Sequence, residues 1–234
     1  MKTGFAIIDA RSPKLAIERL KSENFEVLEF KSENITYNSV SGHPDIFIFQ
    51  TQNGFIIAPN SPIELIYFSE YHKITFEFGN SQIGNEFQNS VAYNCVQTYD
   101  FLFHKAGFTD KKILEQAGNR KIINLPQAYT RCSMIEIAEN NFLTSDAGIK
   151  KVLDSLNLSN FFFSPEEIKI YDHKNGFIGG SCGIFENKIF FNGNFLKHKD
   201  GKALEKFLLS ANLEIICLHN DFLYDGGGIF FNDK

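Results

Sequence analysis

The sequence predicts an α/β fold built from five copies of one β-β-α-β unit. The main observation is a short pattern, a turn residue followed by an apolar strand, that recurs along the chain. It occurs as GFAIIDA from Gly4, GFIIAPN from Gly54, DFLFHKA from Asp100, NFLTSDA from Asn141 and KIFFNGN from Lys188. Successive copies begin 41 to 50 residues apart, so five units account for all 234 residues.

Composition and charge limit the possible partners. The chain is 43% apolar, which is enough for the core of one domain over residues 1–234. Lys and Arg number 23 against 28 Asp and Glu, and no basic block occurs, so nucleic acid is not an expected partner. The first residues, MKTGFAIIDARS, are too briefly apolar for a signal peptide, and no run is long enough to span a bilayer.

The missing signal peptide and membrane span lead us to expect a cytoplasmic protein, and the cysteines are expected to be reduced thiols. The four cysteines are far apart in the sequence, and a chain of this length does not need disulfides to hold a core. The familiar zinc, phosphate and dinucleotide motifs are absent, so neither a metal nor a cofactor is expected.

A helix is predicted after each repeated strand. Ser12-Pro13 and Ser61-Pro62 place a capping hydroxyl before a proline, and Thr109, Asp146 and Asp200 supply the caps in the other units. The helices after Asp146 and Asp200 are amphipathic, with apolar residues at helical spacing, whereas the helix near Ser61 has the weakest pattern.

Each helix is followed by another predicted strand. These strands are FEVLEF from Phe25, KITFEF from Lys73, KIINL from Lys121, NFFFS from Asn160 and EIICL from Glu214. The last two are apolar throughout, which is typical of central strands covered on both faces.

One more strand precedes each repeated pattern except the first. These strands are IFIFQ from Ile46, AYNCVQ from Ala92, SMIEIA from Ser133 and CGIF from Cys182. The first unit lacks this strand, so the C-terminal GGGIFF from Gly226 is expected to pair with the N-terminal strand and close a ring. The expected blades are approximately 226–234 with 1–30, then 43–78, 89–125, 129–163 and 176–218.

A ring of five β-β-α-β blades with pseudo-five-fold symmetry, closed by the two chain ends, resembles the pentein fold, an α/β propeller. That fold is shared by guanidine-modifying enzymes and by the ribosome anti-association factor of eukaryotes and archaea. The segments GHPDIFIF at Gly42, YTRCSMIEIAENNFLTSDAGI at Tyr129, GFIGGSCGIFENKIFFNG at Gly176 and LYDGGGIFF at Leu223 are similar to motifs of an uncharacterised bacterial branch of it.

The resemblance also raises a question about catalysis. The enzymes of this fold resemble one another in a glycine-rich stretch near the C-terminus, GGGIHC in agmatine deiminases, whose cysteine attacks the guanidine carbon. Here Gly226, Gly227 and Gly228 match the glycines, and Phe231 stands at the cysteine position. A phenyl ring cannot act as a nucleophile.

The resemblance implies that the loops entering the first strand of each blade surround a central channel, and here those loops are polar. His43 and Asp45 flank Pro44, which favours an extended His43 with both side chains on one side, as an acid/base pair requires. The alternative is a turn in which Asp45 binds backbone amides.

Cys132 is the candidate nucleophile, because the cation of Arg131 beside it would favour the thiolate. Adjacent residues on a strand point to opposite faces, so a small buried strand residue is the alternative interpretation. Six residues at the blade entries are candidate ligand-binding residues. The alternative is a structural role in a tight turn or in close packing. The six are Asn94, Arg131, Gly180, Cys182, Tyr224 and Asp225.

Two classes of function follow. One is a pocket for a small polar molecule, a guanidine or amino-acid derivative, with hydrolase or amidinotransferase chemistry at a non-standard nucleophile. The other is a non-catalytic interaction protein, comparable to the ribosome-associated branch of the fold.

The five histidines other than His43 share no metal-ligand spacing and are expected in loops or at the surface.

Overall fold

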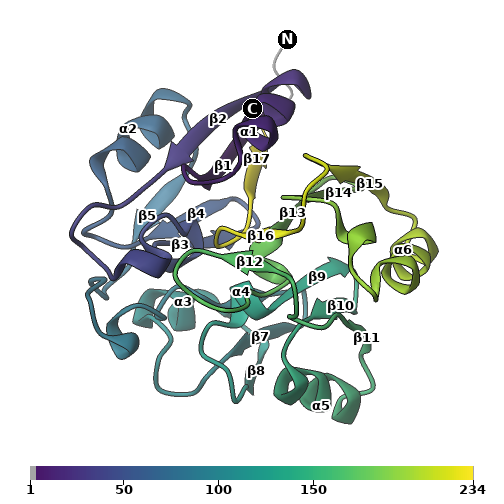
Figure 1. Cartoon of the computed structure of the whole chain (residues 1–234). Helices are drawn as coiled ribbons and strands as arrows, with labels where there is room; N and C mark the ends of the chain where they lie inside the picture. Colours follow the sequence, from purple (N-terminus) through teal and green to yellow (C-terminus); the bar gives the residue numbers. More distant parts are fainter. Residues whose placement is uncertain (1–3, 234) are drawn as a thin grey trace.

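The computed structural model describes residues 4–233. Residues 1–3 and 234, at the two ends of the predicted first blade, lie outside the described residues. Figure 1 shows an α/β molecule in which small sheets lie inside and helices lie on the periphery. No helix within residues 4–233 is long and apolar enough to cross a bilayer.

Five three-stranded sheets share one topology. In each, the first strand runs antiparallel to the middle strand, which is parallel to the third. From first to third strand, the first sheet contains β17 (Phe230–Asp233), β1 (Gly4–Asp9) and β2 (Phe25–Phe30), and the second contains β3 (Ile48–Thr51), β4 (Gly54–Ile57) and β5 (Phe76–Phe78). The third contains β6 (Val96–Gln97), β7 (Phe101–His104) and β8 (Lys121–Asn124), and the fourth contains β9 (Met134–Ala138), β10 (Asn141–Thr144) and β11 (Ser159–Phe162). The fifth contains β13 (Cys182–Phe185), β14 (Lys188–Phe191) and β15 (Glu214–Cys217).

A helix joins the middle and third strands of every sheet. These helices are α1 (Lys14–Ser22), α2 (Ile63–Tyr71), α3 (Lys111–Gln116), α5 (Ala147–Ser155) and α6 (Gly201–Ser210). Their apolar residues pack against the sheets: Leu20 of α1, Leu65 of α2 and Leu153 of α5 are fully buried. Burying one such side chain contributes about 2 kcal/mol, so packing stabilises helices this short.

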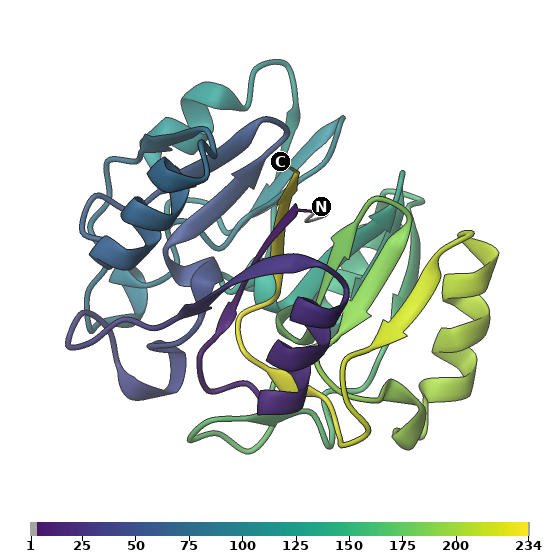
Figure 2. The ribbon, with the colours of Figure 1, turned by 90° about the horizontal axis from the view of Figure 1, so that it is seen from above.

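The C-terminal strand completes the first sheet, as the sequence predicts. β17 pairs antiparallel with β1, in a register that sets Phe231 opposite Ala6. Figures 1 and 2 both show the yellow C-terminal strand beside the purple N-terminal one. The five sheets stay separate: no strand pairing among the described residues links one to the next, so there is no closed sheet.

The entry segments differ from the sequence prediction. Short helical turns form in segments predicted as loops: η2 (Pro44–Ile46) and α4 (Thr130–Ser133) each extend one residue into a predicted strand, and η4 (Gly179–Ser181) lies entirely within a predicted loop. β3, β6 and β9 start later than predicted, whereas β13 starts at Cys182 as predicted, and β6 has only two residues. Pro44 begins η2, and the glycines of η4 tolerate the tight turn, so both segments have a local reason to curl.

Two further predictions are corrected. Asp110, not Thr109, caps α3, because its carboxylate accepts the Lys112 amide, whereas Ser12 and Ser61 make no side-chain cap bond. Asp146 caps α5 as predicted. NFFFS and EIICL form edge strands, β11 and β15, rather than central ones. The Phe161 ring of β11 contacts Phe207 of α6, so the next unit covers its second face.

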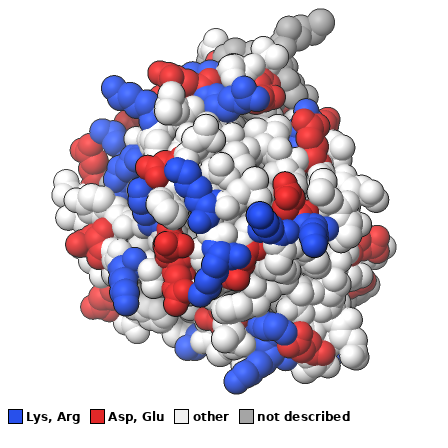
Figure 3. Space-filling view, turned by 45° about the vertical axis from the view of Figure 1, so that its right-hand side comes forward, with Lys and Arg blue, Asp and Glu red and all other residues white. Residues whose placement is uncertain are grey.

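A sixth, two-stranded sheet pairs β12 (Lys169–Ile170) with β16 (Tyr224–Asp225) in parallel. Figure 1 places this sheet in the middle of the view. β12 comes from the segment that links the fourth and fifth sheets, and β16 comes from the segment between β15 and β17. On the face in Figure 3, Lys and Arg are interspersed with Asp and Glu, so this face has no extended basic area.

Candidate active site

Three segments bring His43, Cys132 and Asp225 together. His43 immediately precedes η2, Cys132 lies in α4, and Asp225 ends β16. One imidazole nitrogen, the thiol sulfur and one carboxylate oxygen all lie within 4.8 Å of one another. The side chains are buried, at 1%, 4% and 0% exposure, respectively. We call these residues the buried triad.

Asp45 and Asn94 hold the cysteine in place. The thiol of Cys132 donates to Oδ2 of Asp45 at 2.7 Å. Oδ1 of Asn94 accepts the backbone N–H groups of Arg131 at 2.7 Å and Cys132 at 3.3 Å, which fixes the start of α4. The Asn94 amide also donates to the Asp45 carbonyl, tying this turn to η2. The candidate residue Asn94 thus positions the thiol.

Glycines allow Asp225 to approach the other two residues. Its carboxylate accepts the backbone N–H groups of Phe177 at 2.8 Å and Gly227 at 3.1 Å. A Cβ on Gly180 would lie 1.9 Å from Oδ1 of Asp225, so only glycine fits there. Gly227 has φ +75° and would place a Cβ 2.4 Å from that of His43. The candidate residue Gly180 therefore has a packing role.

Burial sets the protonation states. It raises the pKa of Asp45 to about 6, although the Cys132 thiol donates to that carboxylate. It also raises the pKa of Asp225 to about 6, against the effect of His43. Burial lowers the pKa of His43, and the pKa of Cys132 is well above its ordinary value through burial and the Asp45 charge. At neutral pH the imidazole and thiol are neutral, and the carboxylates are mostly charged.

Several polar atoms of this cluster lack a protein partner. Both ring nitrogens of His43 and Oδ1 of Asp45 are buried without a hydrogen bond among the described residues. Buried polar groups are nearly always satisfied, so such a concentration is unusual for a purely structural core. These atoms are available to a ligand or to water.

A cavity of about 440 Å³ opens over the buried triad. We call it the triad cavity; its lining is Tyr37, Val40, His43, Tyr129, Cys132, Ile170, His173, Lys174, Asn175, Phe177 and Asp225. Five of these residues come from the 164–178 loop that carries β12, so this loop forms the cover of the site. The hydroxyls of Tyr37 and Tyr129 contact each other at the wall, and Tyr129 also bonds Ser90 at 2.7 Å.

The loop residues were missed by the sequence analysis. His173, Lys174 and Asn175 lie between the fourth and fifth units, outside the repeat that identified the other candidates. The connection over residues 164–175 is no longer than the one over residues 31–42, so the spacing of the repeats carried no signal for these residues. His104 was wrongly placed: it is buried in β7, bonded to Thr109 and the Ala128 carbonyl, and burial lowers its pKa to about 4.

Three other candidates do not reach the triad cavity. The Arg131 guanidinium turns away from the thiol and donates to the carbonyls of Gly179 and Cys182. The Cys182 thiol is buried and donates to the Ile178 carbonyl at 3.3 Å, and burial raises its pKa to about 12. The Tyr224 hydroxyl donates to Asp9 at 3.4 Å.

Phe231 lies in the hydrophobic core. Its ring packs at centroid distances of 5.0, 5.8 and 4.9 Å from Phe25, Phe185 and Phe190. It does not line the triad cavity. The position that matches the cysteine of the GGGIHC motif is therefore used for packing between the first and fifth sheets.

The buried triad also has the donor types of a zinc site: imidazole, thiolate and carboxylate. Zinc bonds of roughly 2.0–2.3 Å require donors roughly 3.5 Å apart, so the cluster would have to contract to hold the ion. The donor types of the buried triad fit a zinc ion, but the present distances between the donors are too long for one. The expectation that the protein binds no metal stays a prediction.

The chain matches a family model described as "Family of unknown function (DUF6873)" over residues 7–230. It therefore belongs to that family. No curated protein matches it in sequence.

Its fold is similar to that of pentein enzymes. A C. jejuni agmatine deiminase with substrate bound has a TM-score of 0.61 at 10% identity, over 100% of this chain and 94% of that chain. An amidinotransferase from Microseira wollei has a TM-score of 0.54 at 11% identity, over 97% and 90%. DDAH from Pseudomonas aeruginosa, complexed with citrulline, has a TM-score of 0.53 at 10% identity, over 97% and 94%. The likeness shows a shared fold.

Proposed function

We propose that this member of the DUF6873 family is a cysteine-dependent enzyme acting on a small cationic guanidine or amidine. The observation that carries the proposal is the convergence of His43, Cys132 and Asp225 within 4.8 Å at the base of a cavity. The second support is the Cys132–Asp45 hydrogen bond, which joins a nucleophile to a proton acceptor. We propose the cytoplasm as its compartment, where the four unpaired cysteines would stay reduced.

We further propose that the single domain is a five-bladed ring with the predicted blade boundaries. One cavity is lined by β3, β6, β9 and β13 together with Ile229 and Phe230 at the start of β17. These are the first strands of the five sheets. Such a lining is what a ring of five blades around one axis requires.

The proposed reaction begins with Cys132. As Sγ attacks the central carbon of the substrate, an S–C bond forms and the thiol proton passes to Oδ2 of Asp45. Asp45 then gives this proton to the leaving amine as the C–N bond breaks. Water attacks the resulting thioimidate, with neutral His43 taking its proton, and that proton returns to Sγ as the S–C bond breaks. Replacing water by an amine would give transfer instead of hydrolysis.

The charges of the pocket favour a cationic substrate. Asp45 and Asp225 lie in the cluster, and both are mostly charged at neutral pH. The cavity volume of about 440 Å³ is in the range of small-molecule sites, roughly 300–1,000 Å³. A carboxylate pairs well with a guanidinium or amidinium group, so Asp225 is proposed to bind the substrate cation.

A non-catalytic ligand-binding protein is the second candidate. Burial and Asp45 raise the pKa of Cys132, whereas activated cysteines usually have a lowered pKa. In this alternative, the triad cavity binds a small cation or mediates an interaction without any covalent step.

Labelling by chloroacetamidine, followed by intact mass, separates the two candidates. The enzyme proposal expects one label at neutral pH, lost in Cys132→Ser and formed at least about tenfold faster than with neutral chloroacetamide. Cys217 is the least buried thiol, so Cys217→Ser is the matched control and should keep the label. Labelling at Cys217, or equal rates for the two reagents, would reject the activated thiol and leave the binding protein.

A further inference from the structure

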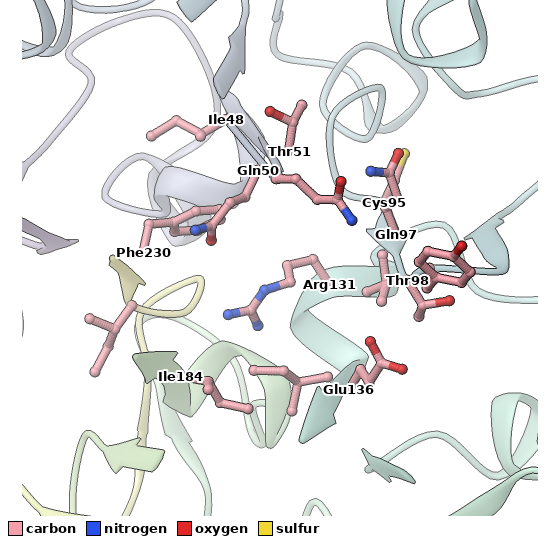
Figure 4. Close-up of a pocket in the computed structure, with 15 residues that line it drawn as sticks. Ile48, Gln50, Thr51, Cys95, Gln97, Thr98, Arg131, Glu136, Ile184 and Phe230 are labelled. Atoms are coloured by element: carbon pink, nitrogen blue, oxygen red, sulfur yellow. The ribbon is translucent and has the colours of Figure 1, made fainter. Parts of the chain in front are cut away.

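A second cavity, of about 330 Å³, lies farther along the same first strands than the triad cavity. Its lining residues follow the triad-cavity residues in sequence, as Ile48 follows His43 and Ile135 follows Cys132. Arg131 reaches into it from α4, so we call it the Arg131 cavity (Figure 4). The proposed chemistry at Cys132 makes no use of this space.

Some of the N–H donors of the Arg131 guanidinium have hydrogen-bond partners and others do not. Nη1 donates to the Gly179 carbonyl at 2.5 Å, Nη2 donates to the Cys182 carbonyl at 3.2 Å, and the group lies 5.4 Å from the Phe230 ring centroid. These contacts hold its plane. Within residues 4–233 no carboxylate forms an ion pair with it, and Nε has no hydrogen-bond partner. A positioned guanidinium with no direct ion pair is a good receptor for a carboxylate.

Glu136 supplies the opposite charge. It is the only acidic residue that lines this cavity in the described chain, and one of its oxygens accepts the Asn140 amide at 3.0 Å. In Figure 4 Glu136 lies apart from the guanidinium and from Phe230. The two charges do not pair directly, so the cavity has one cationic and one anionic point.

The rest of the lining selects the body of the ligand. Apolar side chains are contributed by all five sheets, and the uncharged polar groups include the Gln97 amide. The apolar residues are Ile48, Val96, Ile135, Ile184, Ile229 and Phe230. Glu136 would repel a ligand that carries only a negative charge, and Arg131 would repel a ligand that carries only a positive charge. A molecule that carries both charges and a short apolar chain avoids both conflicts.

We propose that the Arg131 cavity binds an α-amino acid with a short apolar side chain. Its carboxylate takes the free N–H groups of Arg131, and its ammonium group lies toward Glu136. The apolar chain packs against the isoleucines and Phe230.

Calorimetric titration with four related probes tests this assignment. L-Leucine has both charges, 4-methylpentanoate keeps only the carboxylate, 3-methylbutylamine keeps only the amine, and N-acetyl-L-leucine masks the amine. We expect L-leucine to bind at least about tenfold more tightly than each of the other three, since each lost charge removes a charge-assisted hydrogen bond. No binding of L-leucine, or equal binding of 4-methylpentanoate, would overturn the proposal.

Variants locate the site. Glu136→Gln keeps an acceptor for the Asn140 amide, so it should fold, and it should reduce L-leucine affinity to that of 4-methylpentanoate. Arg131→Lys keeps the positive charge but loses the planar donors, so we expect a loss of about tenfold. His43→Ala, in the triad cavity, should bind L-leucine as the parent does. Unchanged affinity in Glu136→Gln, or loss confined to His43→Ala, would place the ligand elsewhere and reject the assignment.

Discussion

The thiol of Cys132 donates a hydrogen bond to Oδ2 of Asp45 at 2.7 Å, although the two residues come from different sheets' entry turns. The hydrogen bond and the Asp45 charge both favour the protonated thiol, and burial does so most strongly. A thiol held in this way is unreactive at rest. The thiol proton must move to Asp45 as the sulfur attacks, so any reaction at Cys132 depends on Asp45.

Replacing Asp45 with Asn tests whether Asp45 acts as a general base or only through its negative charge. If Asp45 removes the thiol proton, Asp45→Asn should label with chloroacetamidine at least about tenfold more slowly at pH 7.5. If Asp45 acts only through its charge, its loss should lower the pKa of Cys132 and make labelling faster. The measurement is the initial rate of mass increase. Faster labelling by the variant would contradict the proposed role of Asp45.

The buried carboxylates should make stability depend on pH. Burial raises the pKa of Asp45 to about 6, against about 3.9 in an unfolded chain. Between about pH 4 and pH 6 the folded state therefore holds the proton more tightly, so the free energy of unfolding falls as pH rises. The loss is on the order of 3 kcal/mol for this carboxylate. Asp225, with a pKa of about 6, should act in the same direction.

His43 opposes this trend, because its pKa is lowered and the unfolded chain takes up its proton first below about pH 6.5. Asp45→Asn isolates one carboxylate from that background. Urea unfolding at pH 4.5, 5.5, 6.5 and 7.5 should give a shallower fall for Asp45→Asn than for the parent. The exposed Asp172→Asn variant should keep the parent's slope. Equal slopes in Asp45→Asn and the parent would mean that the Asp45 pKa is not raised.

Gly180 should not tolerate a side chain. A Cβ there would lie 1.9 Å from Oδ1 of Asp225, whose oxygens are held by the Phe177 and Gly227 amides. We expect Gly180→Ala to lower the free energy of unfolding by roughly 3 kcal/mol. Gly84→Ala is the control, since its nearest neighbour would be 3.4 Å away, and its cost should stay below about 1 kcal/mol.

The cause of that loss can be checked with a double variant. Truncating Asp225 to Ala removes the carboxylate that a Cβ at position 180 would strike. Gly180→Ala should therefore cost less in the Asp225→Ala background than in the parent, and the coupling is read from denaturant unfolding of all four proteins. Additive effects would show that Gly180 is needed for another reason.

The repeat in the sequence was sufficient for the order of elements. Middle strands such as β1 are apolar and flanked by turn residues, so local patterns located them well. Entry turns such as α4 were predicted as polar loops, with only the terminal Ser133 placed in a strand. Their helical form depends on long-range contacts, such as the Asn94 side chain that accepts the amides of Arg131 and Cys132. A local pattern contains no such information.

The candidate site was partly predictable for the same reason. Equivalent positions in a repeat occupy equivalent places, which explains why His43, Cys132 and Asp225 could be selected together although they are far apart in sequence. The cover loop with Lys174 lies outside the repeat, so no symmetry argument could find it. The direction of the Arg131 side chain depends on the carbonyls of Gly179 and Cys182, which sequence spacing does not reveal.

Phe231 provides a last prediction, about the position that matches the enzyme cysteine. Its ring is 3% exposed and packs against Phe25, Phe185 and Phe190. Phe231→Ala should therefore lower the free energy of unfolding by about 3–5 kcal/mol, the usual cost of removing a buried phenyl group. Denaturant unfolding with an unchanged m-value would confirm a packing role.

Restoring the cysteine of the enzyme motif should not restore an enzyme of that type. The side chain at position 231 faces the aromatic cluster, away from His43 and Asp225, so a thiol there has no acid, base or cationic neighbour. Phe231→Cys in a Cys132→Ser background should show no preference for chloroacetamidine over chloroacetamide. Rapid amidine-selective labelling of Cys132→Ser/Phe231→Cys would mean that position 231 faces the substrate and that the catalytic centre lies there rather than at Cys132.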